Sequence, residues 1–116
     1  MKKETFRDRR VGELLKEEIS RIVQYEVKNP NIHGLIITDV VVTKDLSLAR
    51  VYIRSFDGTD MEILRQELDL AKNFIYSKLK KSIKIKKVPN LTFFVDNTLD
   101  YASKIEELLK QVKQQD

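Results

Sequence analysis

The feature that most constrains the fold is the order of two spacings of apolar residues along the chain. One spacing is typical of helices, and the other is typical of strands. From Arg9 to Val27, apolar residues recur at intervals of three and four. That spacing is typical of one face of an amphipathic helix, and Asn29-Pro30 ends the pattern with residues that terminate helices. The chain therefore opens with a helix that must bury one face against a second layer.

The next two segments change to the periodicity of strands. Residues 35–43 (LIITDVVVT) are rich in β-branched side chains, and residues 48–56 (LARVYIRSF) alternate apolar with polar. The link KDLS is short enough for an antiparallel hairpin. In the second strand, Arg50, Tyr52 and Arg54 share one face. A four-residue link predicts three cross-strand pairs: Val41 with Arg50, Asp39 with Tyr52, and Ile37 with Arg54.

The second half of the chain repeats the alternation of helix and strand. Apolar positions from Leu64 to Ile83 predict a long helix that Asp60 caps, and Val88-Pro89 limits its continuation. Residues 91–95 (LTFFV) predict a third strand. A last helix follows, with inward-facing apolar residues at Leu99, Ala102, Ile105, Leu108, Leu109 and Val112.

The predicted order is helix, strand, strand, long helix, strand, helix. The economical packing is an α+β fold in which helices cover one face of a three-stranded sheet. The chain of 116 residues suits a single domain, 1–116, whose core spans about 9–112. The sheet face carrying Arg50, Tyr52 and Arg54 would then be open.

Charge is distributed in blocks along the predicted long helix. Residues 57–69 carry five acids and one arginine, whereas residues 70–95 carry seven lysines and no acid. Six of these lysines fall within KLKKSIKIKK, residues 78–87. Blocks of like charge on a small domain indicate either a polyanionic partner or a well-solvated surface. Composition alone leaves both interpretations open.

The sequence offers little for catalysis or metal binding. Cysteine is absent, and His33 is the only histidine. The three glycines are too scattered for a phosphate-binding loop, and no nucleophile has a base at a suggestive spacing. We therefore expect no enzyme activity, no metal and no cofactor. The apolar runs are too short for a membrane span, so we expect a soluble, cytoplasmic protein.

The basic residues instead indicate RNA binding, because Lys and Arg contact phosphates and aromatic rings stack on unpaired bases. Tyr76 is a candidate for stacking beside the lysines, and Tyr52 and Phe56 are candidates on the sheet. Tyr76 would also fit a position half-covering the core, and Phe56 would also fit packing against a neighbouring element. A solvated helix face is the alternative for the lysines. The predicted RNA-binding residues are Arg9, Arg10, Arg50, Arg54, Lys72, Asn73, Tyr76, Lys80, Lys81, Lys84, Lys86 and Lys87.

Three stretches together resemble the ribosome-binding factor A family: RVGELLKEEISRIV, LIITDVVVTKDLSLARVYI and PNLTFFVDNTLDYASKIEELL. The resemblance implies a type II KH-like domain whose third strand runs parallel to the first. Members have a helix interrupted at an Ala-x-Gly site, which here reads Ala71-Lys72-Asn73. It therefore implies a helix kink at Ala71 and Asn73, since Asn adopts left-handed conformations more readily than most residues.

The same resemblance implies a function. Such factors bind the small (30S) ribosomal subunit late in its maturation, assist processing of 16S rRNA, support growth in the cold, and are released by an assembly GTPase. We expect a monomer whose partners are that subunit and its 16S rRNA. Two alternatives remain: a general single-stranded RNA binder, and a protein–protein adaptor using Phe6, Phe56 or the last helix.

Overall fold

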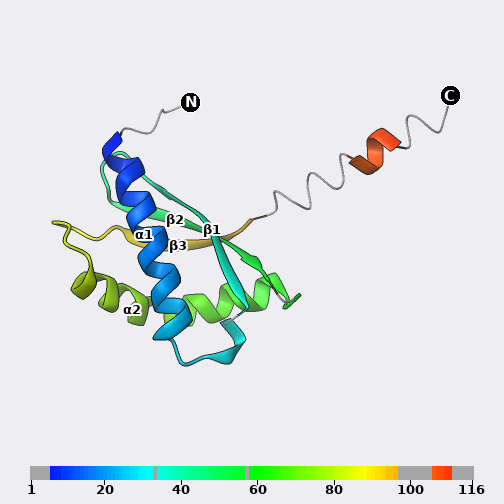
Figure 1. Cartoon of the computed structure of the whole chain (residues 1–116), viewed down its shortest axis with the longest axis horizontal. Helices are drawn as coiled ribbons and strands as arrows, with labels where there is room; N and C mark the ends of the chain where they lie inside the picture. The colour runs from blue at the N-terminus through cyan, green and yellow to red at the C-terminus, as the bar shows by residue number, and fades with distance from the viewer. Residues whose placement is uncertain (1–5, 33, 57, 97–105, 111–116) are drawn as a thin grey trace.

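The computed structural model describes residues 6–32, 34–56, 58–96 and 106–110 (Figure 1). Its elements are α1 (Phe6–Tyr25), a short 3-10 turn η1 (Pro30–Ile32), β1 (Leu35–Val42), β2 (Leu48–Ser55), α2 (Met61–Ser82) and β3 (Asn90–Val95). The predicted order is confirmed through β3, and residues 106–110 are helical.

The three strands form one mixed sheet in the order β1-β2-β3. β1 and β2 are antiparallel, as the short link predicts. β3 pairs in parallel with β2. The expectation that the third strand runs parallel to the first is therefore wrong. After β2, α2 carries the chain back across the sheet, so β3 takes the direction of β2, opposite to that of β1.

The pairing of β1 with β2 agrees with the prediction only in the half of the hairpin nearest its turn. Val41 faces Arg50 and Asp39 faces Tyr52, as expected. Ile37 faces Ile53 instead of Arg54, because the register shifts between Ile37 and Asp39. One extra residue in β1 reverses the inward and outward alternation there. Both Ile37 and Val40 are thereby buried, at 7% and 6% exposure.

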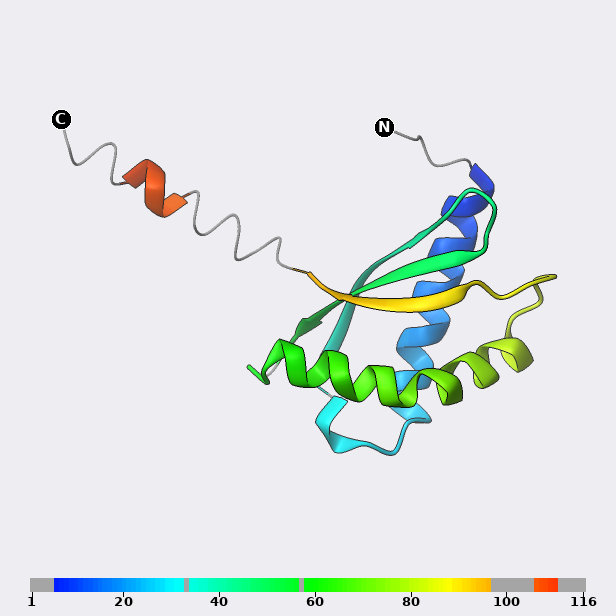
Figure 2. The same cartoon turned by 180° about the vertical axis from the view of Figure 1, so that it is seen from behind.

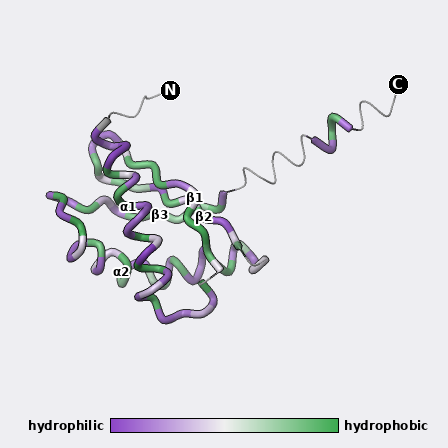
Figure 3. Tube along the Cα trace, in the orientation of Figure 1, coloured by the Kyte–Doolittle hydropathy of each residue, from purple (hydrophilic) through white to green (hydrophobic). Residues whose placement is uncertain are grey.

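Both long helices cover the same face of the sheet (Figures 1 and 2). α1 packs on β1, α2 packs mainly on β3, and the two helices contact each other. In Figure 3 polar and apolar residues alternate along each helix, as amphipathic packing requires. The fully buried large side chains of this core are Leu15, Ile19, Ile22, Ile32, Val51, Ile53, Leu64, Leu68, Ile75, Leu79 and Leu91. The predicted α+β fold with helices on one face is confirmed.

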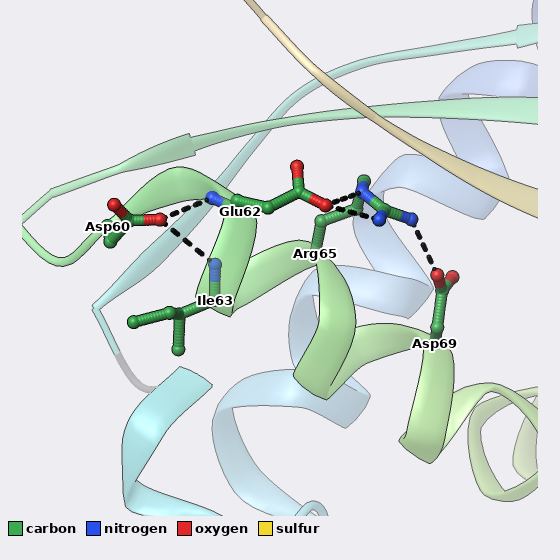
Figure 4. A network of polar contacts seen from close by, with 5 residues as sticks. All are labelled: Asp60, Glu62, Ile63, Arg65 and Asp69. Carbon is green, nitrogen blue, oxygen red and sulfur yellow. Dashed lines mark hydrogen bonds and ion pairs between the residues drawn. The ribbon is translucent and has the colours of Figure 1, made fainter.

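The start of α2 is fixed by polar contacts, which Figure 4 shows. The Asp60 carboxylate accepts hydrogen bonds from the backbone N–H groups of Glu62 and Ile63, at 2.9 and 3.2 Å. Arg65 then joins two acids on the helix surface, Glu62 and Asp69; its Nη1 donates to Asp69 Oδ2 at 2.7 Å. Asp60 caps the helix as the sequence predicts.

The expected kink at Ala71 and Asn73 is not found. α2 continues without interruption from Met61 to Ser82. Outside glycine, the single positive φ among the described residues belongs to Leu46, so Asn73 is not left-handed. The apolar stripe explains the continuity, because Leu68 before the site and Ile75 after it are both fully buried on the same helix face. Asn, unlike Gly, carries a Cβ that disfavours the left-handed conformation.

The last predicted helix is described only at residues 106–110. Leu108 and Leu109 are 60% and 59% exposed. Figure 1 shows this segment away from the sheet, so neither leucine gains core contacts and their predicted inward orientation is wrong. The other apolar positions of that prediction, Leu99, Ala102, Ile105 and Val112, lie outside the described residues.

Candidate nucleic-acid interface

The lysine-rich stretch 78–87 belongs to two structural elements. Its first residues form the last turn of α2, which ends at Ser82. Ile83 is extended, and its N–H donates to the carbonyl of Leu79 at 2.9 Å. Lys84 therefore lies beyond the helix. We call Lys80, Lys81, Lys84, Lys86 and Lys87 the lysine arm.

The lysine arm combines exposed charges with buried apolar anchors. All five lysines are exposed. Between and after them, Ile83 and Val88 are 7% and 6% exposed, and Ile85 packs against the core. The apolar side chains thus hold the segment against the domain while the ammonium groups remain in water.

Tyr76 supports this segment from α2. Its hydroxyl donates to the carbonyl of Val88 at 3.0 Å, and its half-buried ring packs against the core. Lys80 Nζ lies 5.6 Å from the ring centroid. These contacts favour the alternative in which Tyr76 half-covers the core. The ring anchors the loop that carries Lys84, Lys86 and Lys87.

Lys72 and Asn73 lie farther back on α2, away from the arm. Lys72 is half-buried and Asn73 is exposed. Further along α2, Lys78 pairs with Glu26 of α1 at 3.7 Å, and its Nζ atom lies 5.4 Å from the centroid of the Phe74 ring. These contacts use Lys78 to join the two helices, which explains part of the lysine run without any ligand.

Arg50 and Arg54 lie on the sheet face opposite α1 and α2, which we call the open face because no other described element packs on it. Arg50 is exposed and Arg54 is half-buried. Between them, Tyr52 stacks on Phe94 of β3 with ring centroids 5.7 Å apart and an interplanar angle of 29°. We did not predict Phe94. The alternation of LTFFV contained the signal, because burial of Phe93 places Phe94 on the opposite face.

Arg9 and Arg10 occupy the first turns of α1 and are exposed. Arg9 lines a small cavity with Gly12 and Lys16 of α1 and Asp39 and Val40 of β1. The predicted RNA-binding residues thus do not form one patch. They divide into the lysine arm, the two positions in the middle of α2, the start of α1, and the open sheet face.

The helix dipole explains some lysines of the lysine arm but not others. Acids at the start of α2 and bases at its end favour the helix dipole, which accounts for Lys80 and Lys81 in the last turn. The dipole does not account for Lys84, Lys86 and Lys87, which follow the helix. Arg65 is already paired with Glu62 and Asp69 on the helix surface, and its hydrogen bond to Glu62 raises the pKa of the guanidinium and lowers the pKa of the carboxylate.

Two further features, a metal site and a membrane span, are not found in the part of the chain that the structure describes. There, no three His, Asp or Glu side chains gather as a metal site would require. No described helix has the length and apolar character needed to cross a membrane.

Comparisons with known proteins find relatives that match most of the chain. The family model for ribosome-binding factor A matches residues 7–109. The ribosome-binding factor A of Staphylococcus carnosus (strain TM300) is 39% identical over 113 residues, covering 96% of this chain and 97% of that protein.

Solved structures share the fold. The crystal structure of ribosome-binding factor A from Thermus thermophilus aligns with a TM-score of 0.69 and 22% identity, covering 76% of this chain and 93% of that one. A homology model of the Thermus thermophilus factor, fitted into a cryo-EM map of its complex with the 30S subunit, aligns with a TM-score of 0.63 at 22% identity, covering 74% and 91%. The KH-like fold expected from the resemblance is confirmed.

Proposed function

Because the chain belongs to the ribosome-binding factor A family, we propose that it binds the small ribosomal subunit late in maturation and contacts 16S rRNA through the lysine arm. The homologous Thermus thermophilus factor has been placed in a complex with the 30S subunit. Binding is non-catalytic, and assistance to 16S rRNA processing is its consequence. Release by an assembly GTPase, a monomeric state and a cytoplasmic location belong to the same proposal.

The geometry of the lysine arm is the observation that carries the RNA contact. Three of its cations lie beyond the end of α2, where neither the helix dipole nor an ion pair with a described residue explains them. Buried Ile83 and Val88 on either side fix the path of the loop. A firmly attached loop holds its charges in a fixed arrangement, so fewer degrees of freedom are lost when phosphates bind.

The mechanism follows from differential binding. A rigid domain that binds one conformation of a flexible RNA more tightly than the others shifts the population toward that conformation. Lysines contact phosphates without reading base sequence, so they select the spacing and shape of the RNA backbone. No bond needs to be made or broken in this mechanism.

The experiment is a binding titration of purified small subunits over a series of salt concentrations. Each phosphate contact releases counterions, so log affinity falls with log salt by about 0.7 to 0.9 per contact in simple nucleic acids. We expect tight, salt-sensitive binding to small subunits and weak binding to large subunits. Equal affinity for all RNA would indicate a general RNA binder, and a flat salt dependence would indicate a protein–protein adaptor. Either result would contradict the proposal.

A further inference from the structure

A second surface on this protein combines aromatic rings with cations. Resting on the proposed function, we propose that the open face of the sheet binds an unpaired segment of RNA, whose bases stack on the Tyr52–Phe94 pair. Arg50 and Arg54 contact the phosphates of that segment. The site differs from the lysine arm in position and in the kind of RNA that it accepts.

The sheet register creates this site. β1 and β2 pair Asp39 with Tyr52, and β2 and β3 pair Tyr52 with Phe94, so all three side chains point to one face. Arg50 and Arg54 lie two residues before and after Tyr52 on that face, about 6.8 Å away along the strand. The stacked rings are thus flanked by a cation on each side.

The ring pair is not needed to complete the core. The core lies between the helices and the other face, where Val51, Ile53 and Phe93 are buried at 0%, 0% and 3% exposure. Phe94 keeps 39% of its surface exposed even while it stacks on Tyr52. Aromatic rings exposed on a sheet are the platform on which unpaired RNA bases stack in other sheet-based RNA-binding domains.

Charge determines the side of the face on which the RNA lies. Asp39 is adjacent to Tyr52 on the β1 side, and its carboxylate accepts the N–H of Val40 at 2.9 Å. That acid repels phosphates from β1. Phe94 lies on the other side of Tyr52, on the edge strand β3, next to polar Thr92 in the row of Arg50. A second acid, Asp96, follows β3, and its carboxylate accepts a hydrogen bond from the Thr38 hydroxyl at 2.6 Å. The RNA strand therefore follows β2 and β3 and ends at Arg54, before Asp96.

The helices and the open sheet face belong to different layers of the domain (Figure 2). A lysine arm that contacts phosphates and a sheet face that stacks bases can engage two RNA segments at once. Such an arrangement lets one small domain hold an unpaired segment in a fixed position relative to a structured one. This property deepens the proposed role in favouring one RNA conformation.

The test is a titration of the wild-type protein with a short unpaired oligoribonucleotide, followed by the amide chemical shifts of every residue. We expect the shifts to concentrate on residues 50–54 and 92–94. Shifts confined to residues 80–87, or no binding, would overturn the inference. This measurement uses the unaltered chain and does not depend on the folding of any variant.

A pair of variants adds a quantitative test. Tyr52→Ile with Phe94→Ile removes both rings and introduces β-branched side chains, which are suited to strands. Phe74→Leu is the matched control, because Phe74 is an aromatic residue of similar exposure, 43%, on α2. We expect the double variant to weaken oligonucleotide binding at least about fivefold, the lower bound for one lost stacked base. The control should bind as the wild type does.

The outcomes of these experiments distinguish this inference from the proposed function. Equal oligonucleotide affinity for the double variant and the control would overturn the sheet site. If the wild type bound small subunits in the salt series, the proposed function would still stand without the sheet site. Failure of the wild type to bind small subunits would overturn the proposed function itself. Binding of a protein partner at the sheet face, with no response to RNA, would again contradict the inference.

Discussion

Gly12 of α1 packs directly against the backbone of Val40 of β1. A Cβ atom added to Gly12 would lie 2.7 Å from the carbonyl oxygen of Val40, a backbone atom that cannot rotate away. Val42 Cγ2 would be a further neighbour at 3.7 Å. The absence of a side chain at Gly12 therefore lets α1 lie directly on β1.

Gly12→Ala is expected to lower the free energy of unfolding. Helix propensity alone would favour alanine by about 0.8–1 kcal/mol. Overpacking against backbone costs about 1–3 kcal/mol. We expect a net loss of about 1 kcal/mol in urea denaturation. Glu13→Ala, at the exposed neighbouring position, is the control and should change little. A more stable Gly12→Ala protein would show that helix and strand can separate freely.

Asn73→Ala tests the continuity of α2. In an uninterrupted helix, alanine is the better residue by about 0.5 kcal/mol, and Asn73→Gly should cost a few tenths of a kcal/mol. Thermal unfolding of both variants measures these changes. If Asn73 were left-handed at a kink, the order would reverse, because glycine would relieve strain that alanine increases.

Tyr76→Phe is expected to loosen the lysine arm. The change removes the hydrogen bond to the carbonyl of Val88, which contributes about 0.5–1.5 kcal/mol. Trypsin cleavage after Lys84, Lys86 and Lys87 should become faster than in the wild type. Tyr25→Phe is the control, because Tyr25 is 74% exposed. Unchanged cleavage rates would show that the hydroxyl does not hold the loop.

Asp45 is predicted to titrate far below an ordinary aspartate. Hydrogen bonds from the Ser47 and Thr43 hydroxyls and the Ser47 N–H lower its pKa from 3.8 to about 2. Because the folded pKa is depressed, these bonds stabilise the hairpin turn fully above about pH 3.8 and are lost as pH falls through 2. The amide shift of Ser47 should report a midpoint near 2 and should stay flat in Asp45→Asn. A midpoint near 3.8 would contradict the prediction.

Periodicity was sufficient to predict the elements, and the resemblance identified the fold. Spacings of three and four located α1 and α2, and alternation located the strands. The register error arises because local patterns do not report long-range pairing, and the bulge between Ile37 and Asp39 depends on how β1 packs under α1. The expected direction of β3 came from the resemblance, and here the path of α2 makes β3 parallel to β2.

The candidate site was predictable as a set of residues but not as an arrangement. The lysine run is evident in the sequence. The end of α2 at Ser82 and the hydrogen bond from Tyr76 to Val88 depend on tertiary packing, which local sequence patterns do not report. The resemblance implies a kink because relatives have glycine at this site. In this chain, the row of buried apolar residues along one face of α2 favours a continuous helix. Phe94 was missed because its importance depends on its register opposite Tyr52.

The most direct test of the account is small-subunit binding by Lys80→Glu with Lys84→Glu. Both side chains are exposed, so the variant should fold with unchanged cooperativity. Lys16→Glu with Lys28→Glu is the matched control, since it changes net charge equally at exposed positions on and just after α1. We predict a large loss of affinity and a shallower salt dependence for the first variant, and a much smaller effect for the control. Equal affinity for the two variants would contradict the assignment of the lysine arm as the rRNA contact.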